Sequence, residues 1–79
     1  MSYNGHPSRR LWNLALWFGN DEGLYRLAVD AVRSTRNRDA AVRLVCDSLA
    51  EAGLTATPDG YRYSPSGVRY ALGCLEITR

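Results

Sequence analysis

The sequence contains no lysine and a single histidine, His6, among its 79 residues. All ten basic residues are arginine, which indicates a compositional bias of the genome, although arginine also serves bidentate contacts to carboxylate or phosphate. General acid–base catalysis most often uses histidine, and the only one lies in a polar N-terminal segment. No cluster of His, Cys, Asp and Glu has metal-ligand spacing, and no glycine-rich phosphate loop is present. We therefore expect a protein that is not an enzyme, with no catalytic residue, metal or cofactor.

Cysteines and long apolar runs are also scarce. Cys46 and Cys74 are too few and too far apart for a disulfide framework, so we expect reduced thiols, with an intermolecular bridge as the alternative. The first ten residues lack the apolar core of a signal peptide, and no run approaches the roughly 20 apolar residues that cross a bilayer. We expect a cytoplasmic protein without membrane contact. Because a core of this size stabilises by only about 3–5 kcal/mol, a homodimer is a further expectation.

Apolar residues are concentrated in residues 11–18, where Asn13 is the only polar residue among eight. A helix that is apolar nearly all round is buried on several sides, so this segment is predicted to be the central helix of the domain. Gly19 is expected to end the helix, and Asn20 to cap the next one.

Two further helices follow from apolar residues at helical spacing. The second is predicted to run to about Ser34, and the third from about Asp39 to Ala52, closed by Gly53. Ion pairs from Arg43 to Asp39 and Asp47 are expected along the exposed face of the third helix.

The remainder of the chain is less regular. The turn sequence Pro58-Asp59-Gly60, between residues that favour extended backbone, predicts a short hairpin. In the C-terminal segment, Ser64 as cap and Pro65 at the first helical position favour a helix, but an alternating pattern from Val68 fits a strand equally well. The predicted fold is mainly α: a compact bundle of three to four helices, with a short β-hairpin between the third helix and the C-terminal segment. Residues 1–7 are expected to form a flexible arm and residues 8–79 a single small helical domain.

The run Trp12-Asn13-Leu14-Ala15-Leu16-Trp17, followed by residues 20–25 (Asn-Asp-Glu-Gly-Leu-Tyr), resembles a family of small phage-encoded proteins of unknown function. Residues 3–5 are similar to the usual opening of that family, and residues 57–60 resemble its tail. One departure is residues 8–11 (Ser-Arg-Arg-Leu), where the family usually carries an acidic, threonine-containing segment, so a partner surface there would differ in charge. The resemblance implies a phage or prophage origin and supplies no catalytic residue.

Two surfaces are candidates for contact with a partner. Residues 33–38 hold three arginines and no acid, which predicts either a solvated turn or an electropositive surface that meets phosphate or an acidic protein. Tyrosine and arginine also flank the predicted hairpin turn, and both types are enriched at interface hot spots. The candidate partner-binding residues are Arg33, Arg36, Arg38, Arg43, Tyr61, Arg62 and Tyr63.

Small phage-type proteins without a catalytic set usually act by occupying a surface. The leading hypothesis is therefore an inhibitor of a host defence machine, most concretely an anti-CRISPR protein that binds a host protein or ribonucleoprotein, the DNA-targeting CRISPR surveillance complex. The alternative is a winged helix-turn-helix regulator, because residues 52–67 are similar to the wing and following helix of MarR-like repressors. Direct nucleic-acid binding is less favoured, since the net charge is only +2. A third hypothesis is a dimeric assembly helper without a separate ligand.

Overall fold

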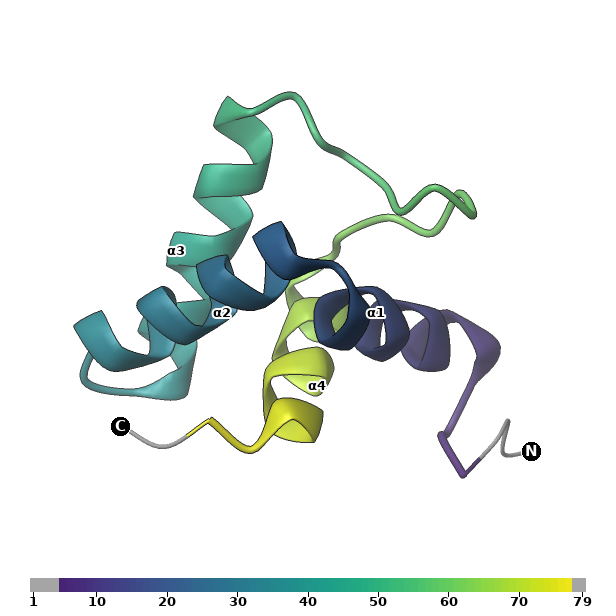
Figure 1. Cartoon of the computed structure of the whole chain (residues 1–79), viewed down its shortest axis with the longest axis horizontal. Helices are drawn as coiled ribbons and strands as arrows, with labels where there is room; N and C mark the ends of the chain where they lie inside the picture. The colour runs from purple at the N-terminus through teal and green to yellow at the C-terminus, as the bar shows by residue number, and fades with distance from the viewer. Residues whose placement is uncertain (1–4, 78–79) are drawn as a thin grey trace.

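Four helices make up the part of the chain that the computed structural model describes, residues 5–77. They are α1 (Arg9–Asn20), α2 (Glu22–Ser34), α3 (Arg38–Glu51) and α4 (Pro65–Leu75). Helix α4 packs against α1 and α3, and α2 packs against both α1 and α3. A long loop leaves the end of α3 and returns to the start of α4 beside α1 (Figure 1). The prediction of a mainly α bundle is confirmed.

Each helix begins at a polar side chain that accepts a hydrogen bond from a backbone N–H of the first turn. These N-cap residues are Ser8, Asp21, Asn37 and Ser64. Such caps satisfy donors that a helix otherwise leaves unpaired. The C-terminal segment is a helix, with Ser64 as its N-cap and Pro65 in its first turn.

The N-cap of α2 lies one residue later than the sequence indicates. Gly19 and Asn20 are still helical, and Asp21 both ends α1 and caps α2. The Asp21 carboxylate accepts from the N–H of Leu24 at 3.0 Å, while its own N–H donates to the carbonyl of Trp17 at 2.9 Å. The predicted roles of Gly19 and Asn20 were therefore wrong, because one aspartate closes both helix ends.

The core lies between the four helices and contains small and branched apolar side chains around Phe18. Its buried members are Leu14, Phe18, Leu24, Ala28, Ala31, Val32, Ala41, Val42, Val45, Leu49, Val68, Ala71 and Leu72. Helix α1 supplies only Leu14 and Phe18 to this core, and Leu16 is exposed. The prediction of a central α1 buried on several sides was wrong, because α4 and α2 cover one side of that helix and its other apolar residues reach solvent.

The expected β-hairpin is also absent from residues 5–77. Only an isolated antiparallel bridge joins Ala56 and Arg62, supported by a bond from Thr57 N to Tyr61 O at 2.8 Å. Two isolated strands are marginal in water. The loop is instead held by side-chain bonds to α1, described below.

Within the described residues, no helix is long and apolar enough to span a membrane.

Candidate partner-binding surface

A hydrogen-bonded cluster fixes the loop between α3 and α4 onto α1. The buried Asn13 side chain donates to the carboxylate of Asp59 at 2.7 Å and accepts from the hydroxyl of Thr57 at 2.8 Å. Trp17 Nε1 donates to the same Asp59 oxygen at 3.1 Å. The hydroxyl of Thr57 also accepts from the N–H of Tyr61 at 3.2 Å. We call Asn13, Trp17, Thr57 and Asp59 the α1–loop cluster.

The electrostatics of this cluster favour an ionised Asp59. The hydrogen bonds from Asn13 and then Trp17 lower the pKa of the Asp59 carboxyl below its ordinary value of 3.8, and the positive charge of Arg9 acts in the same direction. Hydrogen bonds to a carboxylate stabilise its charged form. The polar residues of the sequence motif at 12–17 and of the turn at 57–60 are therefore used to build the fold.

Two glycines of α4 allow arginines from other helices to lie close to its backbone. A Cβ atom at Gly67 would lie 3.3 Å from Nη1 of Arg10, and one at Gly73 would lie 3.0 Å from Nη1 of Arg38. Arg10 also donates to the hydroxyl of Ser64 at 3.1 Å. Gly73 follows Gly67 by six positions, which corresponds to about 9 Å along the helix axis. The guanidinium groups of Arg10 and Arg38 are thus spread along one helix.

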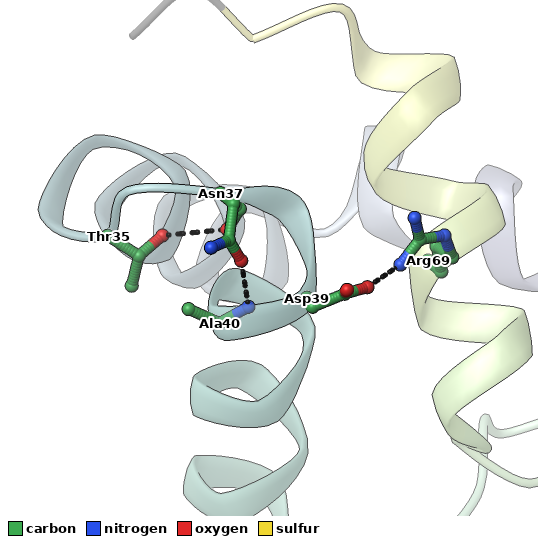
Figure 2. A network of polar contacts seen from close by, with 5 residues as sticks. All are labelled: Thr35, Asn37, Asp39, Ala40 and Arg69. Carbon is green, nitrogen blue, oxygen red and sulfur yellow. Dashed lines mark hydrogen bonds and ion pairs between the residues drawn. The ribbon is translucent and has the colours of Figure 1, made fainter.

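A third arginine, Arg69, lies on α4 between those two glycines. Figure 2 shows its guanidinium directed at the carboxylate of Asp39, with which it forms an ion pair. Asp39 belongs to the first turn of α3, whose start is fixed by the bond from Ala40 N to the Asn37 side chain at 2.8 Å. The ion pair expected between Asp39 and Arg43 is not seen among the described residues, because Asp39 reaches across to α4.

These three arginines line one shallow groove of about 480 Å³, which we call the arginine groove. Its lining residues are Arg10, Leu11, Arg38, Ser66, Arg69, Tyr70, Gly73 and Cys74. The lining holds three positive charges from three helices and no carboxylate. Within residues 5–77, Arg10 and Arg38 form no ion pair. The arginine groove is therefore a cationic surface with donors suited to phosphate or carboxylate oxygens.

One wall of the arginine groove is a tyrosine held by the N-terminal segment. The hydroxyl of Tyr70 and Nδ1 of His6 are hydrogen-bonded at 2.6 Å, and the two rings meet edge to face with centroids 5.7 Å apart. Loss of solvent around the hydroxyl and the neighbouring Cys74 thiol raise the pKa of Tyr70. Tyr70 is thus a neutral, partly buried ring beside three arginines.

A second groove, of about 530 Å³, adjoins the arginine groove between α3 and the start of α4. The two grooves share Ser66 and Arg69, and the second adds Arg43, Asp47 and Cys46. Burial, and then the charge of Asp47, raise the pKa of the Cys46 thiol. A protonated thiol is a poor nucleophile and a poor metal ligand.

The predicted arginines separate into two locations. Arg38 lines the arginine groove and Arg43 the adjoining groove, whereas Arg33 lies in the last turn of α2 and Arg36 in the turn before α3. All four side chains belong to exposed residues. Arg38 shares the arginine groove with Arg10 and Arg69, and Arg43 shares the adjoining groove with Arg69.

The predicted loop residues differ in exposure. Arg62 is exposed and Tyr61 is partly buried. Tyr63 packs edge to face on Phe18, with ring centroids 5.9 Å apart, and burial raises the pKa of its hydroxyl, followed by the charge of Asp21. Tyr63 therefore packs against the core, and Arg62 is the most accessible of the three side chains.

Residues 1–71 match the model of a family of unknown function, DUF7249. The chain belongs to this family. The matched range includes Arg10, Arg38 and Arg69, and it ends before Gly73 and Cys74. No curated protein and no solved structure shows significant similarity to the chain.

The sequence did not single out Arg10, Arg69 and Tyr70 of this DUF7249 chain as partner-binding residues. Arg10 was noted only because residues 8–11 differ in charge from the phage family that the sequence resembles. Arg69 and Tyr70 lie in a segment whose pattern fits a helix and a strand equally well. The spacing of serine and glycine around 64–73 is the available signal, because it places two small residues on one helix. Among residues 5–77, no group of three or more His, Cys, Asp or Glu side chains is placed to hold a metal ion.

Proposed function

We propose that this protein is a phage or prophage accessory protein that inhibits a host defence machine by binding it. The most concrete target is a DNA-targeting CRISPR surveillance complex in the cytoplasm of the infected bacterium. The resemblance of residues 12–25 to small phage-encoded proteins supports the origin. The arginine groove supports the mode of action, because Arg10, Arg38 and Arg69 come from three packed helices and present their charge at fixed positions.

The observation that carries the proposal is this concentration of positive charge on a chain whose net charge is only +2. A ribonucleoprotein exposes phosphate and acidic protein surface, and electrostatic complementarity of that kind speeds association and selects the partner. Contacts with such a complex are expected first at Arg38 and Arg10, then at Arg43 and Arg36. Arg33 and the loop residues 61–63 would extend the same interaction if the partner surface is broad.

The direct test is capture of the tagged protein from lysate of a bacterium with an active CRISPR system, with DNase-treated and untreated samples side by side. The proposal expects one stoichiometric ribonucleoprotein that survives DNase. Expression of the protein should also restore phage plaques on a host that otherwise cleaves the phage DNA. Capture of only DNase-sensitive material, with no restored plaques, would contradict the proposal.

A second candidate, the helix-turn-helix regulator, is favoured by one observation. Helices α2 and α3 are joined by only three residues, 35–37, a length typical of that motif. Its recognition helix would be α3, which carries two arginines and three acids, for a net charge of −1. Because acids on a recognition helix face the phosphates of DNA, we rank this function below the inhibitor. Tight binding to duplex DNA would reverse the ranking.

The homodimer stays a prediction for either function. Sedimentation equilibrium across the micromolar range distinguishes a dimer from a monomer of 8.8 kDa.

A further inference from the structure

We propose that the arginine groove binds the phosphate backbone of a single-stranded nucleic acid, without reading its sequence. For its biological target this inference rests on the proposed function, since a ribonucleoprotein supplies an exposed strand. The binding itself is a property of the groove and is measured with a bare oligonucleotide. The loss of host-complex capture and the loss of oligonucleotide binding are therefore separate results.

The spacing of the arginines is the first argument. The guanidinium groups of Arg10 and Arg38 lie against Gly67 and Gly73, positions that are about 9 Å apart along α4. Arg69 lies between them on the same helix and lines the same groove. The three arginines therefore border one groove at different levels along α4, and a strand of nucleic acid presents successive phosphates to such a groove. Arginine binds each phosphate through two parallel N–H donors.

The charge around these three arginines is the second argument. Among residues 5–77, the residues that line the groove include no carboxylate, and Arg10 donates only to the neutral hydroxyl of Ser64. Asp39 pairs with Arg69 at the side of the adjoining groove, where both side chains are largely exposed. An exposed pair of this kind contributes little free energy, so an incoming phosphate can replace the carboxylate.

The uncharged part of the groove favours a single strand over a duplex. Tyr70 and Leu11 line the groove beside the arginines. Single-strand binding sites combine a positively charged groove with aromatic rings on which bases stack. The hydrogen bond between Tyr70 and His6 restrains the tyrosine ring before a strand binds. In a duplex the bases are already stacked and cannot reach Tyr70.

The experiment is a fluorescence anisotropy titration of the full chain with a labelled 12-nucleotide uridine oligomer, from 50 to 200 mM salt. Three phosphate contacts predict a slope of about −2 for log K, the logarithm of the association constant, against the logarithm of the salt concentration. The association constant should therefore fall about 15-fold across that range. Arg10→Gln and Arg38→Gln should each reduce the magnitude of the slope by about 0.7. Arg26→Gln is the matched control, because Arg26 pairs with Glu22 on α2 and lies outside the arginine groove.

Gly73→Ala tests the same contact without removing a charge. The added Cβ would displace the guanidinium of Arg38, so the affinity for the oligomer should fall several-fold while the chain stays folded. If an arginine substitution disturbs the fold, which circular dichroism and urea unfolding report, Gly73→Ala still tests the contact between Arg38 and the strand.

Each alternative outcome overturns the proposal. No binding at 50 mM salt would remove it, and unchanged slopes in Arg10→Gln and Arg38→Gln would place the phosphates elsewhere. Equal or tighter binding of a 12-base-pair duplex would reject the single-strand assignment. If a poly-glutamate peptide displaces the oligomer at equal charge concentration, the groove recognises acidic protein instead.

Discussion

The side-chain amide of Asn13 donates a hydrogen bond to the carboxylate of Asp59 at 2.7 Å, across 46 residues of sequence. This contact joins the first helix to the loop that leads into the last one. Asn13 is only 2% exposed, and its amide oxygen also accepts from Thr57, which is 3% exposed. A buried polar group is costly unless it is paired, so these residues stabilise the fold only as a set.

Replacing Asn13 by alanine should therefore lower the free energy of unfolding by about 1–3 kcal/mol, because the buried hydroxyl of Thr57 loses its acceptor. Urea unfolding measures the change. Asn20→Ala is the control, since Asn20 is exposed on the same helix and the change should stay within about 0.5 kcal/mol. A loss as small for Asn13→Ala as for the control would show that the α1–loop cluster does not hold the loop.

The stability of the fold should fall in acid through Asp59. Its pKa is lowered in the folded state by the bonds from Asn13 and Trp17, so its contribution is fully present above the unfolded pKa, ordinarily near 3.8. That contribution is lost as the pH falls through the lower folded pKa. The Asp59→Asn variant should therefore show a smaller loss of stability below about pH 4 than the wild type, in urea titrations at several pH values.

Glu51→Gln is the matched control for the acid titration, because Glu51 is exposed and forms no hydrogen bond or ion pair with a described side chain. It should keep the wild-type profile. Identical profiles for wild type and Asp59→Asn would mean that the hydrogen bonds to Asp59 do not couple its ionisation to folding.

Replacing each of the two glycines of α4 by alanine should change the stability of the fold in opposite directions. At Gly67 a Cβ atom would overlap the fully buried side chain of Leu14, so Gly67→Ala should destabilise by about 1–3 kcal/mol. At Gly73 it would meet only the end of the exposed Arg38 side chain, and alanine favours the helix by up to about 1 kcal/mol. Thermal unfolding of both variants compares them directly. A destabilised Gly73→Ala would show that Arg38 cannot move aside.

Local sequence signals located the helices to within a few residues, but they left the C-terminal segment open between helix and strand. The Ser64 cap and the apolar stripes of α2 and α3 act over a few residues, and the structure follows them. At the junction of α1 and α2, Asn20 was expected as the cap because a glycine followed by an asparagine is a usual stop and start. The carboxylate of Asp21 accepts from the first-turn N–H instead.

Contacts distant in sequence were not predictable in the same way. Nothing near Pro58-Asp59-Gly60 indicates that its polar groups would bond to Asn13 instead of forming a hairpin. The arginine groove likewise combines Arg10, Arg38 and Arg69 from three helices, so local charge density pointed only to the turn at 33–38. Residues 1–4 of the expected arm lie outside the described residues, whereas His6 is bonded to Tyr70.

The two arginines nearest the start of α3 should contribute unequally to capture of a host complex. Arg38 lines the arginine groove, and Arg36 lies in the turn before it. Arg36→Glu together with Arg38→Glu should abolish capture, and Arg38→Glu alone should account for most of the loss. Folding should persist, because a glutamate in the first turn of α3 faces the positive end of the helix dipole. Arg26→Glu on α2 supplies the charge-matched control, with capture retained. If Arg36→Glu alone abolishes capture, the contact surface is the turn at 35–37 and the arginine groove is not used.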